Sequence, residues 1–343
     1  MRDYCIINSI VEDEWRSFVD EHPEGNIFHT PEMFWVFNRT RNYQPEIWAA
    51  THKGTIKALF FPVRVTLISQ WVKLFTTRAI SYGSVLYTKD EDGLIGLDTL
   101  LREYIRKTNF SILFTELRHL TDKQDIQDIL LANKFCFEDN VNYLIDLNRS
   151  KEEIFQDIGP RTRKALRKAW NKNQVKIVQV TERRQISLIY RLLEMTYKRA
   201  GIPLADISLF EAAYDILFPK GMIMFTIATV NDEPASVSVD LLYKKTMYGW
   251  FGGTDRKYTP YITNELLTWY LFEWGASHGY HIYDFGGAGN PGEDYGVRTF
   301  KSKFGGALVN YGRNSYLHNP FLFKLSKLVY QATRKFLFGN GER

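Results

Sequence analysis

The sequence has few cysteines and histidines, and it lacks long apolar runs. Its 343 residues include two cysteines, Cys5 and Cys136, which belong to no Cys-x-x-Cys or Cys/His pattern, and seven scattered histidines. This usage argues against a disulfide framework or a zinc site and fits a reducing compartment. No run of about 18 apolar residues occurs, and Met1–Trp15 contains acids where a signal peptide needs an apolar core. We therefore expect a cytoplasmic protein that holds no metal.

Common nucleotide and nucleophile motifs are also absent. The sequence has no P-loop and no Gly-x-Ser-x-Gly elbow. Asp284-Phe285-Gly286 matches the magnesium-binding triplet of protein kinases, but the His-Arg-Asp catalytic loop of those enzymes does not occur. We interpret the triplet as the end of a strand. Gly286, Gly287 and Gly289 then serve to let the chain turn sharply.

Positive charge is concentrated in two segments. The formal net charge is only +5, but residues 161–172 carry six positive charges and no acid. Residues 319–338 carry four positive charges and no acid. Such segments favour anionic partners, although a solvated basic face is an equal alternative for each of them.

The order of predicted elements repeats after roughly 170–180 residues, a period too long for a solenoid. Each half is expected to contain a strand, a tight turn, further strands, a helix and a buried strand. The first-half elements are expected at residues 46–51, 56–65, 94–107 and 112–117. The second-half elements are expected at residues 222–230, 235–242, 247–252, 263–278 and 281–285. Thr263 is a candidate N-cap of the last helix, and Gly279 is its expected stop.

This repeat predicts two copies of one mixed α/β domain. We place the first domain at residues 1–140 and the second at 141–314, with a cleft between them. Residues 315–343 are expected to pack back on the first domain through a helix over 320–338, which has an apolar stripe. The alternative is that this helix touches an anionic membrane surface.

The two-copy topology resembles the GNAT fold of acetyltransferases. In that fold, a Gln/Arg-x-x-Gly-x-Ala/Gly loop binds the pyrophosphate of the acyl donor. The matching segment 253–264 has Arg256 but lacks the loop glycines, and Pro260 removes an amide donor. The first copy has the acidic segment Lys89–Gly93 at this place. We therefore expect neither half to bind acyl-CoA in the usual way.

Five segments, in order along the chain, resemble the FemABX family of aminoacyl transferases, which build peptidoglycan cross-bridges from aminoacyl-tRNA. They are residues 26–34, 161–169, 196–202, 248–254 and 283–306. The last segment carries the closest resemblance, to the family's DFGG … G-x-x-x-F-K-x-x-F-G-G ending. The chain has no room for the long helical hairpin of some members, so it resembles the shorter subtype. The resemblance implies two tandem GNAT-like domains with α/β sheets and no cofactor.

The resemblance also implies roles for matching residues. Lys301 would stabilise the oxyanion that forms when an amine attacks the aminoacyl ester, as a fixed cation can in a partly dry cleft. Phe300 would position the acceptor end of the tRNA. Arg199 would grip the diphosphate of the nucleotide-linked precursor, and Arg39 would supply a second phosphate contact. The alternative for Lys301 is an ordinary surface lysine.

We therefore expect an acyltransferase that moves an amino acid from aminoacyl-tRNA to an amine of a UDP- or lipid-linked muropeptide. Tyr248 and Trp250 would line the acceptor channel. Expected contacts to tRNA or other phosphates are Arg163, Lys164, Arg167 and Lys168. One alternative is an N-acyltransferase that uses acyl-CoA or a carrier thioester on an envelope sugar or lipid amine. Another is a non-catalytic module that binds envelope precursors, and peripheral contact with the inner membrane surface is possible in each case.

Overall fold

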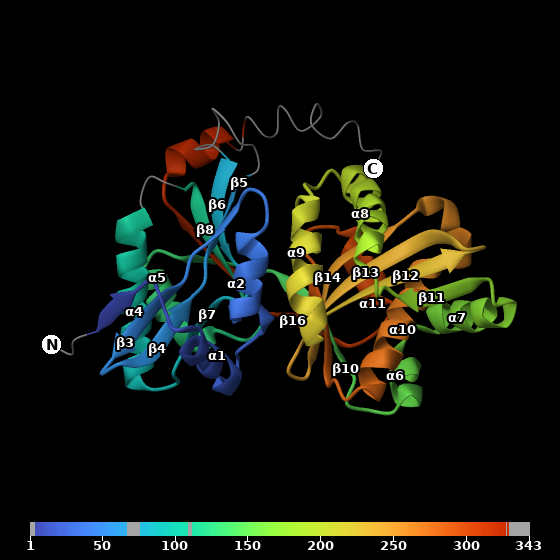
Figure 1. The fold of residues 1–343 in the computed structure, drawn as a ribbon, viewed down its shortest axis with the longest axis horizontal. Helices are drawn as coiled ribbons and strands as arrows, with labels where there is room; N and C mark the ends of the chain where they lie inside the picture. Colours follow the sequence, from blue (N-terminus) through green and yellow to red (C-terminus); the bar gives the residue numbers. More distant parts are fainter. Residues whose placement is uncertain (1–3, 67–75, 109–111, 327, 329–343) are drawn as a thin grey trace. The chain divides into compact units, whose positions relative to one another are not determined.

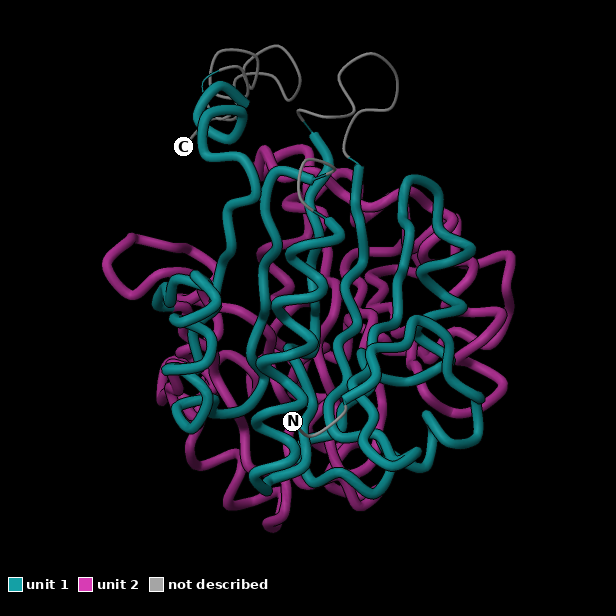
Figure 2. Tube along the Cα trace, turned by 90° about the vertical axis from the view of Figure 1, so that its left-hand side faces the viewer, with its two compact units in different colours: residues 1–139, 311–335 teal, residues 140–310, 336–343 magenta. Residues whose placement is uncertain are grey.

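The computed structural model describes residues 4–66, 76–108, 112–326 and 328 (Figure 1). These residues form two compact units (Figure 2). Among the described residues, unit 1 joins those up to Asp139 with those from Tyr311 to residue 328, and unit 2 is Asn140–Asn310. No helix within the described ranges combines the length and the apolar character that a membrane crossing requires.

Unit 1 contains two β-sheets. The first is antiparallel, in the order β1 (Cys5–Ile7), β3 (Trp48–His52), β4 (Thr55–Phe60) and β7 (Val85–Tyr87). The second has the order β2 (Tyr43–Pro45), β5 (Val63–Thr66), β6 (Thr77–Ser81), β8 (Phe114–Arg118), β17 (Arg313–Leu317) and β9 (Cys136–Glu138). Strands β6 and β8 are parallel, and helix α4 (Glu91–Thr108) connects β7 to β8. A helical crossover of this kind is the usual route to a parallel strand.

The prediction of a single strand over residues 56–65 is wrong, because this segment serves two sheets. Strand β4 ends at Phe60 in the first sheet, and β5 begins at Val63 in the second. Pro62 lies at the switch and has no N–H to donate to a ladder. Its carbonyl accepts from the backbone N–H of Glu46 at 2.9 Å. The apolar run therefore continues in the sequence while the ladder is interrupted in the fold.

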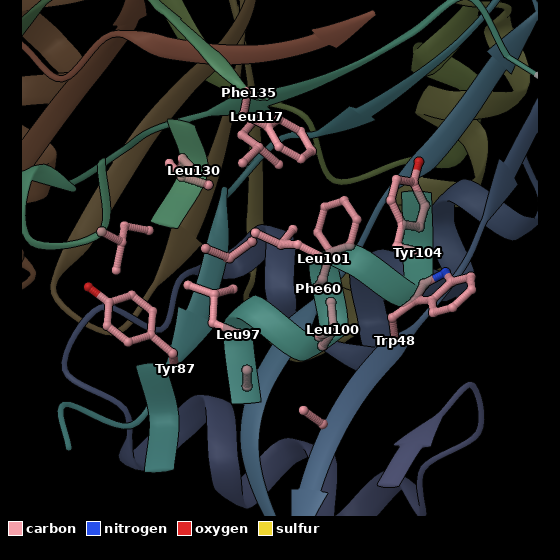
Figure 3. Close-up of a cluster of buried hydrophobic side chains, with 14 of the residues drawn as sticks. Trp48, Phe60, Tyr87, Leu97, Leu100, Leu101, Tyr104, Leu117, Leu130 and Phe135 are labelled. Atoms are coloured by element: carbon pink, nitrogen blue, oxygen red, sulfur yellow. The ribbon is translucent and has the colours of Figure 1, made fainter. Parts of the chain in front are cut away.

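Helix α4 forms the centre of the unit 1 core. The sequence predicts it at 94–107, and the structure extends it to Glu91–Thr108. Four of its large apolar side chains, including Leu97 and Tyr104, are at most 1% exposed and pack in one cluster with residues of both sheets (Figure 3). Their partners include Trp48, Phe60, Leu117, Leu130 and Phe135. Burying each large apolar side chain contributes roughly 1.5–3 kcal/mol, so this helix holds both sheets of unit 1.

The other helices of unit 1 are shorter. They are α1 (Glu12–Glu21), α2 (Pro31–Asn38), α5 (Gln127–Ala132) and the 3-10 helices η1 (Ile27–His29) and η2 (Gln124–Ile126). Thr30 caps α2, since its hydroxyl accepts from the N–H of Met33 and Pro31 occupies the first turn. Of the expected helix 320–338, residues 320–326 are helical, and most of the rest lies outside the described residues. Phe323 packs edge-on against Phe114 of β8, with ring centroids 5.5 Å apart.

Unit 2 is built on one sheet of seven strands. Their order is β11 (Val175–Gln179), β12 (Ile223–Val230), β13 (Glu233–Tyr243), β14 (Thr246–Thr254), β15 (Ile282–Gly287), β10 (Val141–Asp146) and β16 (Ala307–Asn310). Only β14 and β15 pair in parallel within this sheet as described, and α10 (Thr263–Ser277) connects them. The predicted second-half strands and helix correspond to β12, β13, β14, α10 and β15.

Helices cover both faces of the unit 2 sheet (Figure 1). The further helices are α6 (Lys151–Asp157), α7 (Pro160–Lys172), α8 (Ile186–Ala200), α9 (Ile207–Leu217), α11 (Gly296–Ser302), η3 (Arg183–Gln185), η4 (Phe218–Lys220) and η5 (Arg256–Tyr261). Ser236 of β13 contacts Thr263 of α10 through their hydroxyl groups at 2.6 Å. On the opposite face, Gly253 of β14 lies so close to α8 that an added Cβ would be 2.9 Å from the Leu192 carbonyl. Successive strand residues point to opposite faces, so α10 and α8 sandwich the sheet.

Candidate functional site

The candidate site of unit 2 lies where the parallel ladder of β14 and β15 stops. The two strands pair only through Thr246–Tyr248 and Ile282–Asp284. Beyond this point β14 continues along β13 to Thr254, and β15 continues to Gly287 without a ladder to β14. The backbone at the end of β15 therefore carries polar groups that this neighbouring strand does not pair.

Lys301 of α11 supplies a partner for these groups. Its Nζ donates to the carbonyl oxygens of Phe285 at 2.6 Å, Gly286 at 2.9 Å and Gly287 at 2.9 Å. An ammonium group has three donors, and all three have acceptors here. The side chain is only 7% exposed, so the alternative of an ordinary surface lysine is wrong.

The surroundings change the protonation of Lys301. Burial lowers its pKa to about 8, although the nearby Asp284 carboxyl acts in the opposite direction. The group is therefore a fixed cation at neutral pH that can lose its proton in mild alkali. Such a group can stabilise developing negative charge or exchange a proton.

Asp284, the first residue of the DFG triplet, is held by two hydrogen bonds. Its Oδ1 accepts from the Asn142 side-chain amide at 2.5 Å and from the Gly286 N–H at 2.7 Å. Burial raises its pKa. Gly286 has φ of +69° and Gly289 has φ of +78°, so the predicted sharp turns are confirmed at these two glycines. Within the described residues, no group of three or more His, Cys, Asp or Glu side chains could hold a metal.

A second buried carboxyl, Asp240 of β13, was not predicted. Ser238 Oγ and Tyr283 OH donate to it at 2.6 and 2.8 Å, and burial raises its pKa to about 7. Gly249 makes room for this contact, because a Cβ there would be 2.8 Å from the Tyr283 hydroxyl. The sequence signal was the alternation over 235–242, which places Asp240 on a polar strand face. The structure buries that face under α10.

The other expected site residues of unit 2 lie along β14, α8 and α11. Phe300 packs against Phe304 of the core, with ring centroids 5.3 Å apart. Tyr248 reaches the end of β15, since its hydroxyl would be 3.2 Å from a Cβ added at Gly286. Trp250 contacts Phe251 at a centroid distance of 5.0 Å. Tyr248 and Lys301 therefore meet at Gly286, whereas Trp250 belongs to an aromatic cluster.

Arg199 lies in the last turn of α8. Its guanidinium donates to the carbonyl of Thr254 at 3.3 Å, and burial together with the neighbouring Arg256 lowers its pKa. Two arginines, Arg199 and Arg256, thus lie near the end of β14. The sequence had identified Arg256 only as part of segment 253–264, which corresponds to the acyl-donor loop of the GNAT fold. Arg39 follows α2 in unit 1 and is exposed.

The segment that would hold an acyl donor departs from the expected geometry. The prediction that Thr263 caps α10 is wrong, since Ile262 occupies the N-cap position without a side-chain hydrogen bond. Ile262 has φ of +49°, a left-handed conformation that is strained for a β-branched residue. In unit 1, Asp90 Oδ1 accepts from Gly93 N–H at 2.7 Å. A carboxylate of the chain itself therefore occupies the start of α4.

The basic helix α7 is largely open to solvent. Its side chains Lys164, Arg167 and Lys168 are exposed, and Arg163 donates to the carbonyl and side chain of Gln156 at 2.5 and 2.6 Å. Trp170 on the same helix is 43% exposed. The basic segment identified in the sequence thus corresponds to a cationic helix surface that includes one aromatic ring.

Comparisons with known proteins agree with this architecture. Residues 160–301 match the family described as acetyltransferase (GNAT) domain, and no curated protein matches the sequence. FemX aligns over 97% of this chain and 100% of its own, at 16% identity and a TM-score of 0.69. L-PGS from Bacillus licheniformis aligns over 97% and 98%, at 12% identity and 0.57.

A tandem GNAT protein from the clavulanic acid biosynthesis pathway aligns over 93% of this chain and 99% of its own, at 9% identity and a TM-score of 0.56. The predicted mixed α/β class and the tandem GNAT resemblance are confirmed by these full-length similarities. The chain therefore has the tandem GNAT fold of acyltransferases, in the version that it shares with FemX.

Proposed function

We propose that the protein is an aminoacyl transferase that moves an amino acid from aminoacyl-tRNA to an amine of a UDP- or lipid-linked peptidoglycan precursor. The observation that carries the proposal is Lys301, a buried ammonium group fixed at the end of β15. The fold shared with FemX supports the same class of reaction. We place the protein in the cytoplasm, in peripheral contact with the inner membrane surface when the precursor is lipid-linked.

In the proposed reaction, the acceptor amine attacks the carbonyl carbon of the aminoacyl ester. The new C–N bond forms, negative charge develops on the carbonyl oxygen, and Lys301 stabilises this charge in place of one of its three backbone acceptors. The C–O bond to the tRNA ribose then breaks, and the ribose hydroxyl leaves with the proton that the amine loses. No nucleophile of the protein is needed.

The remaining site residues bind the two substrates in this proposal. Arg199 and Arg39 contact acceptor phosphates, and Tyr248 lines the acceptor channel together with Trp250. Phe300 positions the tRNA end next to Lys301. The support for Arg199 is its position beside Arg256, which concentrates positive charge near the end of β14.

The basic helix α7 contacts tRNA phosphates in this proposal. The residues are Arg163, Lys164, Arg167 and Lys168. Because the helix has no acid and most of its cations are exposed, it can attract a polyanion over a range set by the Debye length.

Transfer by purified protein, with labelled aminoacyl-tRNA and a UDP-linked muropeptide, tests the proposal. We expect Lys301→Met to lower kcat by roughly 100- to 1000-fold, as the loss of an oxyanion-stabilising donor does. Lys303→Met is the matched control, because Lys303 follows Lys301 by two residues as the C-cap of α11 and pairs with Glu265 at 3.0 Å in a more exposed position. Absence of transfer with every amino acid tested, or full activity of Lys301→Met, would contradict the proposal.

An N-acyltransferase that uses acyl-CoA is the second candidate, favoured by the acetyltransferase match over residues 160–301. It predicts binding of acetyl-CoA that calorimetry can measure. The strained Ile262 and the Pro260 in η5 argue against the usual amide cradle for the donor. Binding of acetyl-CoA, with transfer of its acetyl group to an amine, would favour this candidate over the first.

A further inference from the structure

A group of arginines lies on one face of the six-stranded sheet of unit 1, around one carboxylate. Arg118 and Glu116 belong to β8, Arg78 belongs to β6, and Arg313 belongs to β17. We propose that this arginine cluster is a binding site for an oxyanion, a phosphate or carboxylate group of a small-molecule ligand. The inference concerns unit 1 by itself and does not depend on the transfer reaction proposed above.

The strand register brings these side chains to the same face. Arg313 is directly opposite Arg118 across the β8–β17 ladder. Glu116 precedes Arg118 by two residues in β8, so its side chain lies on the same face of the sheet. On the other side of β8, Ile80 of β6 pairs with Glu116, which puts Arg78 on this face as well. The residues between them, such as Ala79 and Leu117, point to the core under α4.

Glu116 is shared between two of the arginines. Arg118 Nε donates to its Oε1 at 2.5 Å, and Arg313 approaches its Oε2 at 3.5 Å. Burial raises the pKa of Glu116, but Arg118, Arg313 and Arg78 outweigh this effect and hold the pKa below its usual range. The carboxylate is therefore charged at neutral pH, and it is one acceptor group for several guanidinium donors.

Arg78 differs from the other two arginines of the cluster in one buried donor. Its Nε is buried and has no hydrogen-bond partner within the described residues. Buried guanidinium donors are normally paired, because an unmatched one loses its hydration without compensation. Glu138, opposite Arg313 on β9, is exposed and adds one further negative charge at the margin of the cluster. The three arginines and the two glutamates together carry one net positive charge, which an anionic ligand could neutralise.

An aromatic wall holds the cluster in place. The guanidinium carbon of Arg118 is 5.2 Å from the ring centroid of Tyr82, within the range of a cation–π contact. Tyr82 stacks with Phe28 and with Phe37, at centroid distances of 5.7 and 5.3 Å. Arg118 is therefore supported by packed rings before a ligand arrives, which reduces the entropy that its side chain loses on binding.

The chemistry of the ligand follows from the guanidinium group. Its planar donors match the two oxygens of a carboxylate or of a phosphate, and they do so better than the single ammonium of a lysine. A bound oxyanion would accept a hydrogen bond from Arg78 Nε, which has no partner among the residues that the structure describes, and would neutralise the remaining positive charge. Either a phosphate or a carboxylate satisfies this requirement, so the two are separate arms of the test.

Calorimetric titration of the full-length protein with inorganic phosphate, and separately with acetate, at constant ionic strength tests the proposal. We expect at least one of the two to bind, and Arg78→Met to weaken its binding by roughly tenfold or more, as the loss of a charge-assisted hydrogen bond does. Arg102→Met is the matched control, because Arg102 lies on α4 of the same unit, 67% exposed and paired with Asp98. The control should bind the anion like the unmodified protein.

Arg78→Lys distinguishes loss of anion binding from loss of the fold, since this variant keeps the positive charge and most of the side chain. We expect it to retain the fold and to bind the anion more weakly than the unmodified protein, because the fork of donors is lost. The proposal is overturned if neither anion binds the unmodified protein. It is also overturned if Arg78→Met and Arg78→Lys both bind with unchanged affinity.

Discussion

At the scale of single residues, two buried ionisable groups of unit 2, Lys301 and Asp240, differ in the hydrogen bonds available to their charged forms. The ammonium group of Lys301 donates to three backbone carbonyls. The carboxyl of Asp240 accepts from two neutral hydroxyl groups, those of Ser238 and Tyr283. Burial raises the pKa of Asp240 to about 7, since it penalises the carboxylate more than these hydrogen bonds favour it. Asp240 is therefore protonated in mildly acidic solution when the protein is folded.

This difference predicts a pH-dependent stability. Between the ordinary pKa of an aspartate and about 7, the folded protein binds one more proton at Asp240 than the unfolded chain does. The free energy of unfolding must then fall as the pH rises through this window, by at most about 4 kcal/mol. Asp240→Asn should remove this contribution, so the variant should be more stable than the unmodified protein at pH 8 and should show a clearly smaller gain at pH 5.

Urea unfolding at the two pH values measures the effect, by the shift of the transition that reports on unit 2. Asp232→Asn is a suitable control, because Asp232 lies in an exposed turn with 82% of its side chain accessible. A loss of stability in Asp240→Asn at pH 8 would show that the carboxylate is needed in its charged form.

At the scale of secondary-structure elements, helix α7 combines cations with an exposed aromatic ring. The sequence identified its charge but did not favour base stacking, because no aromatic residues alternate with the basic ones. In the structure, Trp170 is 43% exposed and lies 5.4 Å from the ring of Phe155. A partly supported ring beside cations is the arrangement in which a nucleic-acid base can stack.

If α7 contacts tRNA as proposed, binding of tRNA should show a measurable salt dependence that this helix contributes to. Replacing Lys164, Arg167 and Lys168 together by Gln should weaken binding and lower the slope of log K against log salt by about 2–3, since each lost phosphate contact releases one counterion fewer. Filter binding across a range of salt concentrations gives this slope. A double change of Arg183 and Arg184 to Gln, in the exposed η3, should leave the slope unchanged. An unchanged slope in the triple variant would remove α7 from the tRNA contact.

At the scale of the whole molecule, the chain completes unit 1 only after it has completed unit 2. Strand β17 follows the last strand of unit 2 in the sequence, yet it pairs with β8 on one side and β9 on the other. It also carries Asn314, which is 1% exposed and accepts from Gln127 while it donates to the carbonyl of Phe135. Unit 1 therefore depends on residues far from its other strands in the sequence.

Truncation after Asn310 tests this dependence. We expect it to unfold unit 1, because β8 and β9 lose the strand between them, while unit 2 retains all of its strands. Fluorescence of Trp15 and Trp48, which are buried in unit 1, and limited proteolysis should report the loss. Truncation after Ser326 keeps β17 and the contact of Phe323 with Phe114, so it should preserve unit 1. Native-like fluorescence after truncation at Asn310 would mean that β17 is dispensable.

Much of the fold could be predicted because it depends on local patterns. The periodicity of apolar residues located α4, α10 and the strands of the second half, since burial of one face requires the same spacing in any protein. The switch of 56–65 between two sheets could not be predicted, because Pro62 ends one ladder without breaking the apolar run. The cap of α10 was also missed, since the hydroxyl of Thr263 has a closer partner in Ser236 of β13.

The sequence by itself determined the tandem GNAT architecture and drew attention to Lys301, through its resemblance to a known ending. Only the tertiary structure decided that Lys301 is buried against the end of β15 and that Asp240 lies on a covered face. It also decided that, in the described part of the chain, a buried donor of Arg78 has no partner. The physical reason is that periodicity specifies which face of an element is apolar. Protonation, pairing and exposure depend on what other elements, distant in the sequence, bring against that face.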